Sequence, residues 1–282
     1  MIQTVSVIGA GTMGTGIAQA SALGGCRVLL HDVAEEFVQR GLATIHKQMD
    51  EGVARKKITP EAAKAAKESV RSTLSLAEAA DADLIIEAAP EKLELKRELF
   101  AQLDALAPAR TIFASNTSSL SINALAAATR RADRFVGLHF FNPAHLMPLV
   151  EVIPSDSTSD ETLQAVTDYV LRIKKTPVRC KDTPAFIVNR VARPFYGEAL
   201  RLLGEGAADV PTIDALLESA GFKMGPFRLI DLIGCDVNFA VTQSVYEAYF
   251  QDPKYRPHPI QRRMVESGRL GRKTKRGFYD YD

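Results

Sequence analysis

Residues Thr4–Asp32 read TVSVIGAGTMGTGIAQASALGGCRVLLHD, and the type of fold can be predicted from these residues. The β-branched run Thr4–Ile8 predicts a buried strand, and Cys26–His31 predicts a second one. Between them, Thr12–Leu23 has a helical pattern that Gly24 ends. A strand, a glycine-rich turn, a helix and a strand form a βαβ unit, which is typical of parallel sheets covered by helices.

The glycines between the first strand and the helix follow the pattern G-x-G-x-x-G. The first permits a tight turn, the second lets the backbone approach a pyrophosphate, and the third lets the helix pack on the strand. The predicted cofactor-binding residues of this loop are Gly9, Gly11, Thr12, Met13 and Gly14. Asp32 ends the second strand, where a carboxylate bonds ribose hydroxyls and repels a 2′-phosphate. No positive charge follows directly, so the sequence predicts NAD rather than NADP.

The rest of the chain predicts an α/β fold with two domains. Strand patterns alternate with helical ones, which predicts a largely parallel, Rossmann-type sheet. The predicted elements are the helices Glu35–Met49 and Leu93–Leu106, and the strands Asp83–Ala88, Thr111–Ser115, Phe135–His139, Leu149–Ile153 and Pro177–Lys181. Only nine residues separate Phe135–His139 from Leu149–Ile153, so these two strands are predicted to be antiparallel. We expect an NAD-binding domain over residues 1–184 and an all-helical domain over 185–282, with helices at Pro211–Ser219, Pro226–Ile233 and Asp236–Phe250 and a loop at Pro253–Pro259.

Composition excludes several classes of protein. The 282 residues carry a net charge of +1, which disfavours a nucleic-acid partner or a membrane surface. The three cysteines lack a C-x-x-C spacing, so we expect neither disulfides nor a metal site. No leader or apolar run long enough to span a membrane is recognisable, and we expect a cytoplasmic protein.

Two polar residues in apolar strand patterns suggest catalysis. His139 ends one predicted strand, and an imidazole titrates near neutral pH, as a general base must. Glu151 interrupts the next strand, LVEVI, where a buried charge needs a partner. If the two strands pair, the carboxylate can orient the imidazole. His145, in the connecting loop, is the alternative base, but it lacks an evident carboxylate partner.

Three polar motifs carry a family resemblance. They are Ser115–Leu120 (SNTSSL), His139–Pro143 (HFFNP) and Lys181–Arg190 (KDTPAFIVNR). With LVEV from Leu149 and GPF from Gly225, they resemble the 3-hydroxyacyl-CoA dehydrogenase family along nearly the whole chain. The resemblance implies that His139 is the catalytic base, that Glu151 is its partner, and that Ser118 and Asn189 surround the reacting oxygen.

The same resemblance implies further contacts. Additional cofactor contacts would come from Glu91, Lys96, Ser118, Asn142 and Lys273, and substrate contacts from Lys56, Ser118 and Asn189. It also implies a homodimer that takes a short acyl-CoA, such as 3-hydroxybutyryl-CoA, as its substrate. Met49 and the loop His145–Pro148 depart from the family pattern, which leaves the preferred acyl chain open.

Simpler interpretations exist for several of these residues. Ser118 has the position of an N-cap before a helix at 120–128, and Lys56, Glu91 and Lys96 could be surface charges. Two alternative functions also fit the fold: a dehydrogenase of a free hydroxy acid or sugar acid, and a non-catalytic NAD-binding protein.

Overall fold

The structure is a computed structural model that describes residues 1–282. The chain divides into two compact units, Met1–Thr183 and Pro184–Asp282, which are described separately. No helix in either unit is long and apolar enough to cross a membrane.

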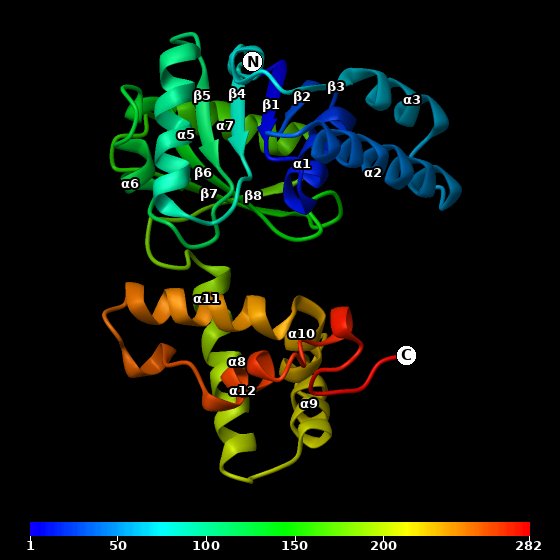
Figure 1. The fold of residues 1–282 in the computed structure, drawn as a ribbon, viewed down its shortest axis with the longest axis vertical. Helices are drawn as coiled ribbons and strands as arrows, with labels where there is room; N and C mark the ends of the chain where they lie inside the picture. Colours follow the sequence, from blue (N-terminus) through cyan, green and yellow to red (C-terminus); the bar gives the residue numbers. More distant parts are fainter. The chain divides into compact units, whose positions relative to one another are not determined.

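The first unit is built on one eight-stranded sheet with the order β3-β2-β1-β4-β5-β6-β7-β8 (Figure 1). The strands are β1 (Thr4–Ile8), β2 (Arg27–His31), β3 (Val70–Thr73), β4 (Leu84–Glu87), β5 (Ile112–Ser115), β6 (Phe135–Phe140), β7 (Leu149–Pro154) and β8 (Thr176–Arg179). Neighbouring strands are parallel, except that β6 and β7 are antiparallel. The predicted Rossmann-type sheet and its antiparallel pair are therefore confirmed.

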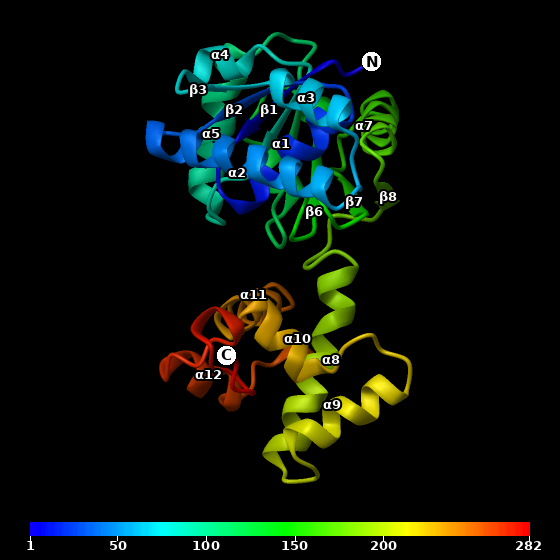
Figure 2. The same cartoon turned by 90° about the vertical axis from the view of Figure 1, so that its right-hand side faces the viewer.

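Helices cover both faces of this sheet. They are α1 (Thr12–Leu23), α2 (Glu35–Ala54), α3 (Pro60–Ser69), α4 (Leu76–Ala80), α5 (Leu93–Leu106), α6 (Ile122–Ala126) and α7 (Asp160–Arg172), with a short η1 (Ala132–Arg134). In Figure 1, α5 lies to the left of the sheet and α2 and α3 to the right, and in Figure 2 α1, α2 and α3 lie in front of it. Burial on both sides explains why the central strands are continuous apolar runs rather than alternating ones.

Each face has its own core. Alternate residues of a strand point to opposite faces. Phe113 and Phe135 pack against Phe100 of α5, with centroid separations of 5.7 and 4.7 Å from that ring. Ala114 and Val136 instead belong to the core formed with α1, α2 and α7. The alternation therefore fixes which strand residues can reach each face.

Several element boundaries differ from those predicted. Helix α2 runs five residues beyond Met49 to Ala54. Four elements, α3, β3, α4 and α7, were not predicted from the sequence, although α3 and α7 have clear starts. Thr59 caps α3 and Ser159 caps α7, in each case by accepting a backbone N–H at the third following residue. These are ordinary N-caps, so the signals were present in the sequence.

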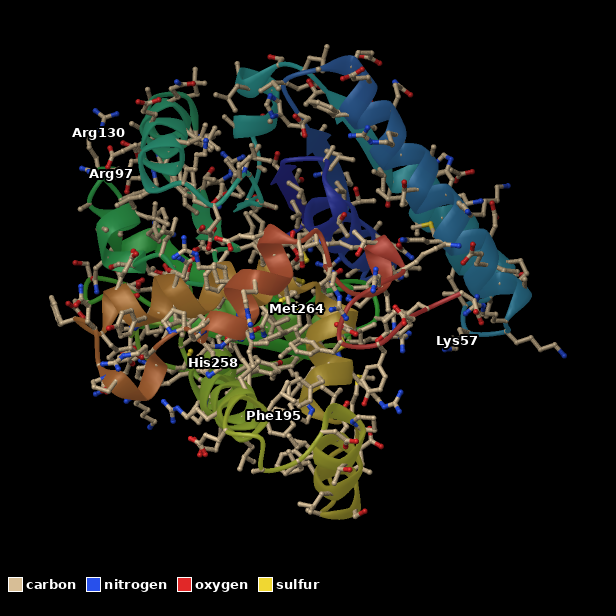
Figure 3. The ribbon with its side chains drawn as sticks, turned by 60° about the horizontal axis from the view of Figure 1, so that its bottom comes forward. Lys57, Arg97, Arg130, Phe195, His258 and Met264 are labelled. Carbon is tan, nitrogen blue, oxygen red and sulfur yellow. The ribbon has the colours of Figure 1, made fainter.

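The second unit contains only helices. They are α8 (Val188–Gly204), α9 (Val210–Ser219), α10 (Pro226–Ile233), α11 (Cys235–Ala248) and α12 (Pro259–Glu266), with short η2 (Pro253–Tyr255) and η3 (Arg272–Thr274). Figure 3 labels His258 at the start of α12 and Met264 within it. The region predicted as a loop, Pro253–Pro259, therefore contains η2 and the beginning of a missed helix, α12.

The C-terminal segment of the second unit is tied to a buried carboxylate. Asp231 of α10 is 1% exposed and accepts the backbone N–H groups of Phe278 and Tyr279 at 2.9 Å each. The Tyr281 hydroxyl donates to the same carboxylate at 2.9 Å. Gly277 packs so closely that a Cβ there would lie 2.1 Å from the carboxylate. These contacts hold the segment that carries Lys273 against the helices.

Candidate active site

The glycine-rich loop after β1 has three glycines with different surroundings. Gly9 has φ +108°, and a Cβ there would lie 2.7 Å from the Ala88 carbonyl oxygen. A Cβ on Gly14 would lie 1.8 Å from the Gly9 oxygen. Gly11 has no heavy atom within 4 Å of the position of a Cβ. The fold itself therefore requires Gly9 and Gly14, whereas Gly11 leaves open space of the kind that a phosphate needs.

Asp32 holds this loop from the end of β2. Its Oδ2 accepts the Ala10 N–H and its Oδ1 accepts the Val33 N–H, both at 2.7 Å. A cavity of about 770 Å³ opens beside the carboxylate. Its lining includes Gly9, Gly11, Thr12, Met13 and Asp32, with the apolar side chains of Phe37, Leu95 and Leu99. The volume lies within the range of small-molecule and cofactor pockets, about 300–1,000 Å³.

Sheet topology places this cavity where cofactors bind in such folds. Strand order reverses between β1 and β4, because the chain runs outward to β2 and β3 and then returns to β4. Ligands of open α/β sheets bind at the carboxyl ends of the strands beside such a reversal. An open Gly11, an acidic residue at the end of β2 and an apolar cavity all fit a dinucleotide such as NAD.

His139 and Glu151 form a buried pair across the antiparallel strands. The two residues are direct partners in the β6–β7 register. His139 Nδ1 lies 2.7 Å from Glu151 Oε2, and the side chains are 8% and 1% exposed. The ring of Phe141 packs at 4.5 Å from the imidazole. This geometry orients the imidazole with one nitrogen toward the carboxylate, which can stabilise a positive charge on the ring.

A second buried pair lies at the end of β4. Glu87 is fully buried, and its Oε1 accepts from Lys96 Nζ at 2.5 Å while its Oε2 accepts from Ser115 Oγ at 2.6 Å. Burial raises the pKa of Glu87, although the Lys96 ammonium acts in the opposite direction. Lys96 is 1% exposed and also donates to the Ala89 carbonyl at 3.0 Å. It is not a surface charge, but a buried cation held by the protein.

Glu91 connects Lys96 to the loop that carries Ser118. Lys96 Nζ lies 3.3 Å from Glu91 Oε2. Glu91 Oε1 accepts from Thr117 Oγ1 at 2.6 Å and from the Ser118 N–H at 2.8 Å. Burial alone would raise the pKa of Glu91, but Lys96 and these hydrogen bonds lower it below its usual value. The ionised Glu91 carboxylate therefore holds the loop after β5 in place through these hydrogen bonds.

The structure also corrects the interpretation of Ser118 as an N-cap. Helix α6 begins at Ile122, and its N-cap is Ser121, whose hydroxyl accepts the Ala124 N–H at 3.2 Å. The Ser118 hydroxyl instead points to Glu91 Oε1 at 3.3 Å. A capping role therefore does not explain Ser118.

The remaining predicted residues have mixed surroundings. Asn142 and Lys56 are exposed, and Lys56 has φ +55° in the turn after α2. His145 is half-buried, and burial together with nearby Lys175 lowers its pKa. Met49 is fully buried in the core of the first unit, so its side chain offers no surface to a substrate.

Two predicted residues belong to the second unit. Asn189 is half-buried in the first turn of α8. Lys273 in η3 forms an ion pair with Asp236, at 2.5 Å from Oδ1. Their roles toward a cofactor or substrate stay predictions.

Two residues with evident structural roles were absent from the predicted site. Glu87 interrupts the apolar strand DLIIEA just as Glu151 interrupts LVEVI, so the same argument would have found it. Asn116 follows β5, and its Oδ1 accepts the Phe140 N–H at 2.9 Å, beside His139. No local pattern distinguishes such an amide from an ordinary loop asparagine.

Comparison with known proteins identifies the family. Residues 4–183 match the NAD binding domain of 3-hydroxyacyl-CoA dehydrogenase, and residues 186–281 match its C-terminal domain. The chain belongs to the 3-hydroxyacyl-CoA dehydrogenase family. It is accordingly an oxidoreductase with NAD as its cofactor, and both predictions are confirmed.

Individual relatives of this family are similar over the whole chain. A 3-hydroxyadipyl-CoA dehydrogenase from Escherichia coli is 47% identical over 281 residues, covering 99% of this chain, which spans 59% of that relative's length. A 3-hydroxybutyryl-CoA dehydrogenase from Bradyrhizobium diazoefficiens is 45% identical, covering 100% of this chain and 96% of the relative. The crystal structure of (S)-3-hydroxybutyryl-CoA dehydrogenase from Ralstonia eutropha superposes with a TM-score of 0.95 at 43% identity, and each chain is fully covered.

Proposed function

We propose that this chain oxidises (3S)-3-hydroxyacyl-CoA to 3-oxoacyl-CoA with NAD, and that its substrates have short acyl chains such as 3-hydroxybutyryl-CoA. The observation that carries the proposal is the buried His139–Glu151 pair, 2.7 Å apart, in the same unit as the glycine-rich loop. The names of the two relatives at 45% and 47% identity support an acyl-CoA substrate.

His139 acts as the general base in this proposal. Its Nδ1 faces Glu151, so Nε2 is the nitrogen that takes the proton of the substrate hydroxyl. As the proton arrives, the imidazole becomes a cation, and the adjacent carboxylate stabilises that charge. In the reverse direction the same imidazolium returns the proton to the oxygen. Ser118 and Asn189 would donate hydrogen bonds to the oxygen on which charge develops.

The cofactor site follows from the first unit. Gly9, Gly11, Thr12, Met13 and Gly14 would hold the pyrophosphate at the start of α1, and Asp32 would bond the adenosine ribose. A bound NAD would supply the acceptor for the hydride that leaves the carbinol carbon. Further contacts are proposed for Glu91, Lys96, Asn142 and Lys273. Since the Lys96 ammonium already contacts three acceptors, its effect on the cofactor would act chiefly through Glu91.

Lys56 is the proposed contact for the CoA portion of the substrate. It is exposed, in a turn that also contains Arg55 and Lys57. A flexible ammonium suits the phosphates of CoA. Replacement of Lys56 by Ala should raise KM for acetoacetyl-CoA and leave KM for NADH unchanged.

The decisive test is turnover by His139→Gln. We expect this variant to lose activity with acetoacetyl-CoA and NADH while it still binds NADH. The matched control is a substitution of the alternative base, His145→Gln, which should remain active because His139 takes the proton in this proposal. Activity in His139→Gln, or its loss only in His145→Gln, would refute the assignment of the base.

A panel of substrates tests the substrate class. Acetoacetyl-CoA should be reduced far faster than free acetoacetate, and 3-oxoadipyl-CoA and longer 3-oxoacyl-CoA thioesters locate the preferred chain. A preference for the free acid would favour the alternative dehydrogenase. No turnover with any thioester would favour a non-catalytic NAD-binding protein.

We further propose that the protein acts in the cytoplasm, in fatty acid metabolism, as a homodimer. Three free, buried cysteines agree with a reducing compartment. Exposed apolar side chains of the second unit, among them Val191 at 70% and Val237 at 46%, support a self-association surface. Sedimentation velocity tests the dimer, and a monomer at assay concentration would contradict it.

A further inference from the structure

We propose that Asn116 is a positioning residue, whose side-chain carbonyl holds the end of β6 and so places the His139 imidazole for proton transfer. The inference rests on the proposed function, because it assumes that His139 is the base.

The end of β6 lacks a neighbouring strand on one side. The last paired residues between β5 and β6 are Ser115 and Gly137. Strand β6 continues to Phe140, and over these last residues it pairs with β7 alone. His139 lies in this extension, so only one neighbouring strand fixes its backbone.

The Asn116 side chain occupies the place of the missing strand. Its Oδ1 accepts the Phe140 N–H at 2.9 Å. Phe140 is 2% exposed, and a buried N–H without an acceptor is costly. The side-chain carbonyl therefore continues the hydrogen bonding of β5 for one more step, directly after His139.

Asn116 is itself fixed. Its backbone N–H donates to the Glu87 carbonyl oxygen at 2.8 Å, at the end of the central strand β4. The following residue, Thr117, is fixed through its hydroxyl to Glu91 at 2.6 Å. Because Asn116 and Thr117 are both fixed by hydrogen bonds, the Asn116 side chain holds the backbone next to His139 at a defined position relative to strand β4.

Catalysis is sensitive to such positioning. A misplacement of about 1 Å at a reacting group can lower the rate about 10²-fold. Without the Asn116 acceptor, the Phe140 N–H could form a hydrogen bond only with water, and the end of β6 would shift or fray. Binding of NADH should be affected little, because Asp32 bonds to Ala10 and Val33, whereas Asn116 bonds to Phe140 and Glu87, so that the two sets of hydrogen bonds share no residue.

The test compares Asn116→Ala with Asn116→Asp. Alanine removes the acceptor, whereas aspartate keeps an acceptor oxygen at the same distance along the side chain. We expect kcat for acetoacetyl-CoA reduction to fall about 10- to 100-fold in Asn116→Ala, with KM for NADH within about twofold of wild type. Asn116→Asp should recover most of kcat.

Asn123→Ala is the matched control. Asn123 Oδ1 also accepts a backbone N–H, that of Asp156 at 2.9 Å, and Asn123 is half-buried like Asn116. Its removal should lower the melting temperature to a similar extent and leave kcat unchanged. An equal loss of kcat in Asn123→Ala would show a general effect of stability and overturn the proposal.

A spectroscopic measurement separates positioning from direct contact. The proton between His139 and Glu151 should give a downfield NMR resonance that persists in Asn116→Asp and broadens or moves in Asn116→Ala. A folded Asn116→Asp that stays as impaired as Asn116→Ala would overturn positioning in favour of contact through the amide NH₂. Should Asn116→Ala not fold, Asn116→Asp is compared with the wild type: a kcat close to that of the wild type supports positioning, and a loss of about tenfold or more overturns it.

The two proposals fail separately. Wild-type kcat in Asn116→Ala together with an inactive His139→Gln would reject the positioning role and leave the proposed function intact. Activity in His139→Gln would reject the function itself.

Discussion

Replacement of Glu151 by Gln should reveal how much the buried carboxylate contributes to proton transfer. Glu151 is 1% exposed and its Oε2 lies 2.7 Å from His139 Nδ1. Two unit charges whose centres are about 4 Å apart interact by about 4 kcal/mol at an effective dielectric constant of about 20. Since about 1.4 kcal/mol changes a rate tenfold, loss of this stabilisation corresponds to about three decades in kcat.

The glutamine keeps a hydrogen-bonding group beside the imidazole, so part of the effect remains. We therefore expect kcat for oxidation of 3-hydroxybutyryl-CoA to fall about 10²- to 10³-fold, with the dissociation constant of NADH unchanged. Initial rates of NADH formation measure the first quantity and fluorescence titration the second. Glu161→Gln, an exposed glutamate of α7, is the control and should be fully active. A Glu151→Gln rate within about tenfold of wild type would show that the carboxylate does not stabilise the imidazolium.

Three further outcomes follow from the geometry. Gly11→Ala should fold like wild type, since its Cβ meets no atom within 4 Å, but should raise the dissociation constant of NADH at least about tenfold by obstructing the pyrophosphate; unchanged affinity would contradict the assigned site. Gly14→Ala should instead impair folding, because its Cβ would lie 1.8 Å from the Gly9 oxygen, and a normal melting temperature would contradict that packing. Burial raises the pKa of Asp104, but Arg131 at 2.6 Å and other hydrogen bonds lower this pKa overall. The ionised Asp104 therefore contributes fully to the free energy of unfolding above the unfolded pKa, about 3.9, and this contribution is lost as the pH falls further. Asp104→Asn should thus unfold more readily than the wild type at pH 7. It should also lose less stability than the wild type on acidification, as measured by urea titration at pH 7 and at a pH below the unfolded pKa of aspartate.

The sequence predicted those features that depend on short segments. The glycine-rich loop and Asp32 lie within one βαβ unit, so their spacing alone indicates a dinucleotide site. The pairing of His139 with Glu151 was also predictable, because a nine-residue connection between two strand patterns is too short for a helical crossover. In each case chain connectivity limits the possible geometry.

The supporting network depends on contacts between distant segments. Lys96 lies on the buried face of α5 with Phe100 and Leu103, and Glu87 and Glu91 surround its ammonium at the end of β4. The role of Asn116 depends on β5 ending before β6, a difference in strand length that no local pattern encodes. The roles of such residues can be recognised only once it is known which strands are neighbours in the sheet and in what register they pair.

The register of β6 and β7 also has consequences for how this enzyme can change. His139 and Glu151 face each other because they are partners in the β6–β7 register, and the register does not depend on which side chains the connecting loop at 141–148 carries. Within that loop Phe141 packs against the imidazole, whereas Leu146, Met147 and Pro148 are exposed and can be exchanged without rebuilding the proton-transfer pair. A single residue inserted within either strand, in contrast, would turn one of the two side chains to the opposite face of the sheet. The structure thus separates a segment that is free to diversify from one in which even the number of residues is fixed.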